Sequence, residues 1–212
     1  MVNKQACIIF DMDGTLIDSS TAMTKSVNFV RGTLGLEPID RAFLEYHINQ
    51  PDHHLPKIFY NTQEYDPAHR ALFKEHYLES ARHVIALYPH VKEMLTYLSH
   101  KATLSIATNA SDFFAHNMLQ HLEILDFFTL IIGANNVKAS KPNPEMIQMI
   151  MDATKSKPQN TILIGDSIKD ELAATNANIQ FIFADWGYGT SETALVKAKD
   201  IQALQCLLER FI

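Results

Sequence analysis

Short apolar runs alternate with helical patterns along most of the chain. Five runs end in small or polar residues and span 7–10, 104–107, 130–133, 162–165 and 181–184. Runs of this length that are rich in β-branched residues are typical of strands buried on both faces. From about residue 89 onward, helical stripes lie between them, namely Val91, Met94, Leu95 and Leu98; Met146, Ile147, Ile150 and Met151; and Ile201, Leu204, Leu208 and Phe211. This alternation predicts an α/β fold with a doubly wound, mostly parallel, Rossmann-like sheet.

The region 16–88 has a different pattern and contains no convincing strand. Its first apolar stripe has helical spacing and consists of Met23, Val27, Val30 and Leu34. Asp66 followed by Pro67 predicts a second helix start, because Asp favours the N-cap and Pro the first turn. We therefore predict a helical cap domain over 16–88, inserted into a core formed by 1–15 and 89–212.

The composition narrows the classes of function. The chain has 212 residues, a net charge of −6 and a pI near 5.9, which argues against a nucleic-acid partner. The two cysteines, Cys7 and Cys206, are too few for a disulfide framework. No apolar run approaches the ~20 residues of a membrane span, so we expect no membrane partner and a cytoplasmic location. Monomer and homodimer are both open.

Polar side chains follow four of the predicted strands. They are Asp11 and Asp13 after the first run, Thr108 and Asn109 after the second, Lys141 after the third, and Asp166 and Asp170 after the fourth. Ligands of parallel α/β sheets bind beyond the carboxyl ends of the strands, so we expect these side chains to share one site.

Four carboxylates in one site repel each other unless a cation neutralises them. Hard oxygen ligands favour Mg²⁺, which usually takes one or two carboxylates together with waters and a substrate phosphate. With Lys141, such an ion could stabilise the charge of a phosphoryl group in transfer. The pattern therefore indicates a magnesium-dependent site for a phosphorylated small molecule.

Four ordered segments give a more specific hypothesis. The segments "DMDGTLIDS", "IATN", "KPNP" and "GDSIKD" resemble the four motifs of the haloacid dehalogenase superfamily. "YPHVKEML" and "WGYG" are similar to the phosphoglycolate-phosphatase-like branch. The resemblance covers 1–15 and about 89–212, and it is weakest in 16–88, where Asn49 stands in place of a glycine that relatives often carry.

The resemblance implies roles for the site residues. Asp11 is implied as a nucleophile that forms an aspartyl-phosphate, and Asp13 as the acid and base that serves both halves of the reaction. The implied magnesium ligands are Asp11, the backbone carbonyl of Asp13, and Asp166. Asp170 is implied to bind the ion directly, to bind it through a water molecule, or to support the residues that bind it. Lys141 is implied to hold the nucleophile and the phosphate. The implied phosphate-binding residues also include Thr108, with Asn109 beside it.

These roles predict a phosphatase that hydrolyses a small phosphorylated metabolite. The resemblance makes phosphoglycolate the leading substrate, and sugar phosphates, nucleotides and pyrophosphate stay open. Two alternatives stay open. A sugar phosphomutase of the same superfamily keeps both early aspartates, although its fourth motif tends to read Glu-Asp-Ser where this chain has Gly165-Asp166-Ser167. A binding module without catalysis could share the fold, but it has no chemical reason to keep the whole set.

Overall fold

A six-stranded parallel sheet forms the core of the protein. The computed structural model describes residues 6–212. The strands are β1 Cys7–Phe10, β4 Thr103–Ala107, β5 Leu130–Ile132, β6 Thr161–Gly165, β7 Gln180–Ala184 and β8 Lys197–Ala198. Their order is β5-β4-β1-β6-β7-β8, and every neighbouring pair is parallel. The predicted α/β fold is confirmed, and each of the five predicted runs forms a strand.

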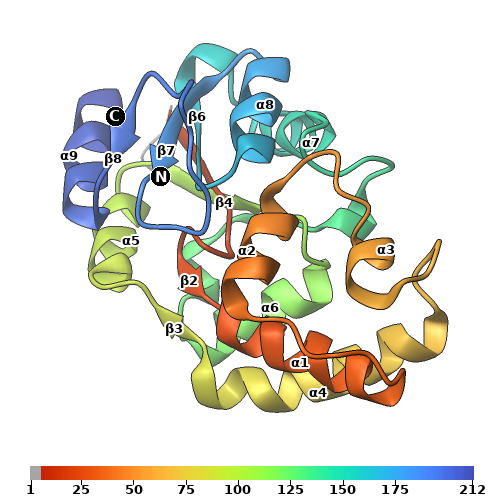
Figure 1. The fold of residues 1–212 in the computed structure, drawn as a ribbon. Coiled ribbons are helices and arrows are strands. Elements are labelled where there is room, and N and C mark those ends of the chain that lie inside the picture. The colour runs from red at the N-terminus through yellow and green to blue at the C-terminus, as the bar shows by residue number, and fades with distance from the viewer. Residues whose placement is uncertain (1–5) are drawn as a thin grey trace.

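Helices cover both faces of this sheet (Figure 1). They are α5 Val91–Ser99, α6 Asp112–His121, α7 Glu145–Thr154, α8 Ile168–Asn176 and α9 Ile201–Phe211, with short 3₁₀ turns η1 Leu125–Phe127, η2 Ala134–Asn136 and η3 Pro158–Asn160. Ile8 and Phe10 of β1 pack in the cluster that α5, α6 and α9 join, whereas Cys7 and Ile9 pack in the cluster of α7 and α8. Successive side chains of a strand point to opposite faces, which explains why β1 is apolar throughout.

β1 lies at the position where the strand order reverses. After β1 and the inserted helices, the chain builds β4 and β5 on one side, then returns to β6 on the other side. In open α/β sheets this switch point is where ligands bind, outside the carboxyl ends of the strands. The backbone N–H of Asp11 donates to the carbonyl of Ile164 on β6 at 2.8 Å, so the carboxyl ends of β1 and β6 stay side by side.

Four helices lie within residues 20–84 and gather at one end of the molecule (Figure 1). They are α1 Ser20–Thr33, α2 Arg41–Asn49, α3 Leu55–Tyr60 and α4 Pro67–Val84. They share a small apolar cluster of their own, formed by Val27, Val30, Leu44, Phe59 and Tyr60. The predicted helix start is confirmed, because Asp66 accepts the backbone N–H of Ala68 at 2.7 Å. The boundaries of the inserted domain at 16 and 88 stay a prediction.

A short antiparallel pair joins this helical region to the core. β2 Ile17–Asp18 pairs with β3 Ala86–Leu87. The sequence-based expectation that 16–88 holds no strand was therefore wrong at both of its ends. Two-residue strands carry no readable alternation, and their pairing depends on a contact between segments that are far apart in the sequence.

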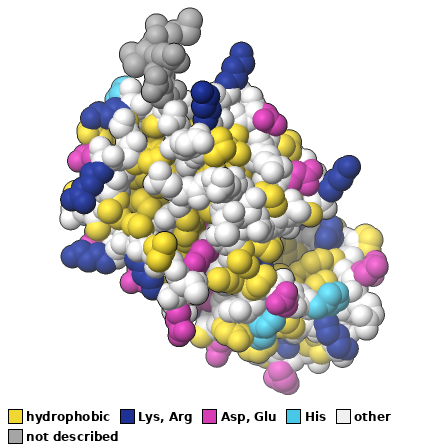
Figure 2. Space-filling model, turned by 90° about the horizontal axis from the view of Figure 1, so that it is seen from above, with side chains coloured by type: hydrophobic (Ala, Val, Ile, Leu, Met, Phe, Trp, Pro, Cys, Tyr) yellow, Lys and Arg dark blue, Asp and Glu magenta, His cyan; other side chains and the backbone are white. Residues whose placement is uncertain are grey.

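The surface carries charges of both signs. On the face in Figure 2, side chains of Lys and Arg are interspersed with those of Asp and Glu. Within residues 6–212, no helix is both long and apolar enough to cross a membrane.

Candidate active site

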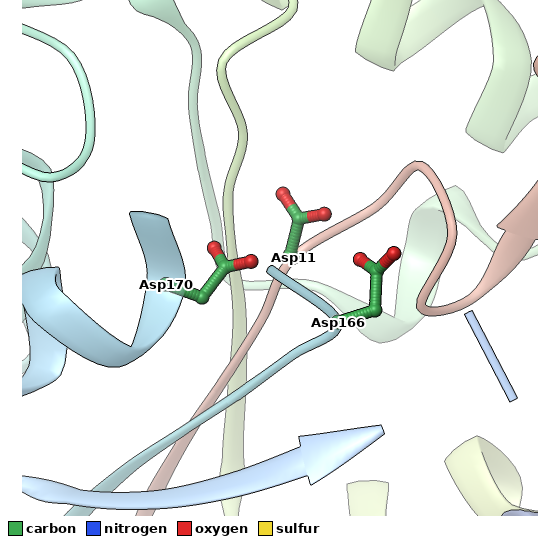
Figure 3. A group of neighbouring side chains, drawn as sticks. All are labelled: Asp11, Asp166 and Asp170. Atoms are coloured by element: carbon green, nitrogen blue, oxygen red, sulfur yellow. The ribbon is translucent and has the colours of Figure 1, made fainter. Parts of the chain in front are cut away.

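Three buried carboxylates meet at the carboxyl edge of the sheet. Asp11 follows β1, Asp166 follows β6, and Asp170 lies in the first turn of α8 (Figure 3). Each offers an oxygen atom, and these atoms lie within 4.8 Å of one another. The prediction that distant segments bring these aspartates together is thus consistent with the geometry, while their chemical roles stay predictions.

Lys141 lies among these carboxylates and is itself buried. Its Nζ donates to Asp11 Oδ1 at 2.6 Å, to Asp170 Oδ1 at 2.5 Å and to the carbonyl of Ala107 at 2.6 Å. Asn109 fixes the lysine backbone, because its Nδ2 donates to the Lys141 carbonyl at 2.9 Å and its Oδ1 accepts the Lys141 N–H at 3.0 Å. The lysine is therefore held from both its backbone and its ammonium group.

Neighbouring groups orient the other two carboxylates. Asp166 Oδ1 accepts the hydroxyl of Thr15 at 3.1 Å, and Oδ2 accepts the backbone N–H of Tyr188 at 2.7 Å. Asp170 Oδ2 accepts the hydroxyl of Ser167 at 2.5 Å and its N–H at 3.2 Å. These supporting roles of Thr15 and Ser167 were not predicted from the sequence. Their only signal is that each lies within the motif of an aspartate that was singled out.

Two glycines allow the close approach of the carboxylates. Gly14 has a φ of +83°, and a Cβ atom there would lie 2.3 Å from Asp166 Oδ2. A Cβ atom at Gly165 would lie 2.4 Å from Asp170 Cγ. Any larger residue at either position would displace a carboxylate, and at Gly14 it would also strain the backbone.

Asp13 lies close to the cluster but outside the group of three. Its Oδ1 accepts the hydroxyl of Ser19, which is buried at the start of α1. Burial raises the pKa of Asp13, while the hydrogen bond from Ser19 lowers it. A carboxyl with a raised pKa holds its proton at a pH closer to neutrality than a free Asp does, and this suits a role as acid and base.

The electrostatics of the cluster favour protons or a cation. Burial raises the pKa of Asp166 to about 7, with the charge of Asp170 adding to the shift. Burial also raises the pKa of Asp11 well above its ordinary value, against the lowering effect of Lys141. Burial alone would lower the pKa of Lys141, but Asp11 and Asp170 raise it, so the ammonium stays charged.

A divalent metal ion fits this donor set. The three carboxylates carry three negative charges when ionised and Lys141 carries one positive charge, which leaves two negative charges uncompensated. All three candidate ligands offer carboxylate oxygen atoms, the ligand type that hard divalent cations prefer. Among residues 6–212, these three aspartates are the one group of at least three Asp, Glu, His or Cys side chains whose ligand atoms lie close enough together to hold a metal ion.

The remaining predicted residue and the inserted helices border the same edge. Thr108 is buried, and its Oγ1 accepts the backbone N–H of Ala110 at 3.1 Å. Lys169, next to Asp170 in sequence, donates to the carbonyl of Ile48 at the end of α2 at 2.5 Å. The helices of 16–88 therefore contact the core beside the cluster.

The sequence is similar to those of known proteins. The family model described as haloacid dehalogenase-like hydrolase matches residues 8–184, a span that contains every predicted site residue. The chain belongs to this family. This haloacid dehalogenase-like hydrolase is 28% identical over 207 residues to a phosphoglycolate phosphatase from Vibrio vulnificus, with 92% of the chain and 90% of the relative covered. It is 29% identical to a 5'-nucleotidase from Pseudomonas aeruginosa, with 95% of each covered.

A solved structure supports the fold of this haloacid dehalogenase-like hydrolase. A haloacid dehalogenase-like family hydrolase from Streptococcus pneumoniae superposes with a TM-score of 0.81 at 24% identity, covering 99% of this chain and 100% of that one. The resemblance inferred from the four motifs is thereby confirmed at the level of family and fold.

Proposed function

We propose that the protein is a Mg²⁺-dependent phosphatase that hydrolyses a small phosphorylated metabolite. The observation that carries the proposal is the convergence of Asp11, Asp166, Asp170 and Lys141 at the switch point of the sheet, with Asp13 beside them. The two relatives, a phosphoglycolate phosphatase and a 5'-nucleotidase, support a phosphoric monoester as the substrate class.

The chain's own residues provide a two-step path. In the first step, a carboxylate oxygen of Asp11 attacks phosphorus, the bond to the leaving oxygen breaks, and Asp13 gives that oxygen a proton. In the second step, Asp13 takes a proton from water, the water oxygen attacks phosphorus, and the bond to Asp11 breaks. The sequence releases one alcohol and one phosphate and restores both aspartates.

The other residues bind and orient the phosphate. Lys141 carries a positive charge next to Asp11 and can stabilise the negative charge that moves onto the phosphoryl oxygens. Thr108 offers a hydroxyl at the end of β4, and Asn109 holds Lys141 in place. Asp11, Asp166 and the Asp13 carbonyl would hold Mg²⁺, with Asp170 binding it directly or through water, and the bound ion would supply positive charge to the phosphoryl oxygens.

The substrate assignment rests on the family resemblance and on the inserted helices. Phosphoglycolate is the leading candidate, and the helices of 16–88 are the expected contacts of the leaving group, because they reach the core beside the cluster through Ile48 and Lys169. The cytoplasmic location and the choice between monomer and homodimer remain predictions.

Phosphate release across a panel of phosphorylated metabolites, with Mg²⁺ present, tests this function. We expect the highest kcat/KM for a small monophosphate. Release of phosphate from no compound of the panel, including p-nitrophenyl phosphate, would contradict the proposal and favour a binding module. Conversion of a sugar phosphate into its isomer without net phosphate release would favour a phosphomutase.

Mg²⁺ is expected to stabilise the protein more at about pH 8 than at about pH 5. The pKa of Asp166 is raised from 3.8 to about 7, and that of Asp11 is also raised. The folded state therefore keeps protons that the unfolded state has lost. This stabilising contribution is present below about pH 4 and is lost as the pH rises through about 7. At higher pH the ionised cluster binds the cation without competition from protons.

Thermal unfolding with and without Mg²⁺ at both pH values measures this effect. A shift in Tm of equal size at the two pH values would contradict the account of the cluster.

Ca²⁺ is expected to activate poorly, since its looser coordination suits in-line transfer less well, so strong activation by Ca²⁺ would count against Mg²⁺ as the cofactor.

A further inference from the structure

The phenol of Tyr188 anchors the start of the first inserted helix. Its Oη accepts the backbone N–H of Ser19 at 2.7 Å and that of Ser20 at 3.0 Å. Ser20 is the first residue of α1, where backbone N–H groups have no partner within the helix. Tyr188 thus provides the acceptor that a capping side chain usually provides, from a segment more than 160 residues away in the sequence.

The same phenol lies next to the hydroxyl that orients Asp13. Tyr188 Oη is 3.3 Å from Ser19 Oγ, and Ser19 Oγ donates to Asp13 Oδ1. Two N–H groups occupy the lone pairs of Tyr188 Oη, so its own proton donates. The acceptors within reach are Ser19 Oγ at 3.3 Å and, at 3.4 Å, the carbonyl of Ile17 and Oδ1 of Asp18. Because the proton of Ser19 points to Asp13, the Ser19 oxygen can accept from Tyr188. The three groups then form one chain from the tyrosine, through the serine, to the carboxylate.

The loop that carries Tyr188 is pressed against the active-site cluster. A Cβ atom at Gly187 would lie 2.2 Å from Asp166 Cβ, and one at Gly189 would lie 2.2 Å from the Asp166 carbonyl. The backbone N–H of Tyr188 donates to Asp166 Oδ2 at 2.7 Å. Tyr188 is therefore fixed at both ends, with its backbone on a candidate metal ligand and its hydroxyl on Ser19.

We propose that Tyr188 is a positioning residue for Asp13 and acts through the hydroxyl of Ser19. The inference rests on the proposed function. Ser19 occupies Oδ1 of Asp13 as a donor whether or not the carboxyl is protonated. The transferable proton is thereby assigned to Oδ2, and the carboxyl is held in one rotamer for both proton transfers. A phenol keeps its proton at neutral pH, so Tyr188 remains a donor.

The role makes a prediction that depends on the leaving group. kcat/KM includes the steps up to the first release of a leaving group, where Asp13 acts as an acid. An alkyl alcohol needs a proton to leave, whereas p-nitrophenolate does not. Tyr188→Phe is expected to lower kcat/KM by about tenfold to a hundredfold for the alkyl monophosphate that the wild type hydrolyses fastest, and by less than about threefold for p-nitrophenyl phosphate. The kcat for p-nitrophenyl phosphate should fall more than its kcat/KM, since Asp13 also serves as the base.

Ser19 provides an independent second variant. Ser19→Ala is expected to give the same dependence on the leaving group, and Ser19→Thr, which keeps a hydroxyl, should restore most of the activity. The double variant should lose little more than either single variant, because the two residues act in one chain. Tyr97→Phe is the matched control. Tyr97 is on α5, and its hydroxyl accepts from the ammonium group of Lys101 in an exposed contact. Thermal unfolding shows that each variant is folded at the assay temperature.

The outcomes separate this inference from the proposed function. Asp13→Asn serves as a reference and should show the same selective loss more strongly. If the wild type releases no phosphate, the proposed function fails. If Asp13→Asn lowers kcat/KM equally for both substrates, the acid role of Asp13 in the proposed mechanism fails. If Asp13→Asn is selective but Ser19→Ala and Tyr188→Phe lower kcat/KM equally for both substrates, or leave it unchanged, the positioning role is overturned.

Discussion

Asp11→Asn is expected to lower phosphate release by at least about a thousandfold while the protein stays folded. The amide is a poor nucleophile, and no other carboxylate can replace it, because Asp166 and Asp170 are each held by hydrogen bonds to neighbouring groups. The fold should persist, since Lys141 keeps its contacts with Asp170 and the Ala107 carbonyl. Phosphate release and thermal unfolding are measured on the same preparation.

Asp126→Asn is the matched control for this substitution. Asp126 is exposed in η1, so the same chemical change there should leave kcat within about twofold of the wild type. An Asp11→Asn variant that keeps substantial turnover would remove Asp11 as the nucleophile. Loss of activity together with unfolding would require a comparison with Asp11→Glu, which keeps the charge but moves the carboxylate.

Lys141→Met should destabilise the protein strongly and abolish its activity. The buried ammonium compensates two carboxylates at 2.6 and 2.5 Å, and removal of one partner from a buried ion pair costs about 3–5 kcal/mol. The loss should shrink at low pH. Lys141 lowers the pKa of Asp11, so in its absence the pKa of Asp11 rises further and a proton replaces the missing positive charge as the pH falls.

Urea unfolding of Lys141→Met at about pH 8 and about pH 5 measures this loss. Lys138→Met, at an exposed position close by in the sequence, controls for the chemical change and should unfold like the wild type. A Lys141→Met protein as stable as the wild type at the higher pH would mean that the cluster does not need the lysine charge.

The local pattern of the sequence was sufficient to predict the core of the fold. The run 7–10 is apolar throughout because β1 is buried on both faces, and the same reason holds for the other central strands. The rule that ligands bind beyond strand ends then placed Asp11, Asp166 and Lys141 at one edge, although they are distant in the chain. The family match agrees with the motifs that carried the resemblance.

Other features could not be predicted from local patterns. β2 and β3 have two residues each, so no periodicity identifies them, and they form only because the ends of the inserted segment meet. The hydrogen bonds from Ser19 to Tyr188 and from Thr15 to Asp166 each join segments more than 150 residues apart. Such contacts depend on the side-chain geometry at the carboxyl ends of the strands in the folded protein.

The account depends most on the assignment of Asp11 as the residue that carries the phosphoryl group. The direct measurement uses Asp13→Asn with p-nitrophenyl phosphate and Mg²⁺, followed by acid quench and peptide mass spectrometry. Because this leaving group needs no proton while hydrolysis needs Asp13, we predict a burst of about one p-nitrophenolate per protein and a phosphoryl adduct on Asp11. Turnover by the wild type with no adduct in this variant, or an adduct on another residue, would contradict the account.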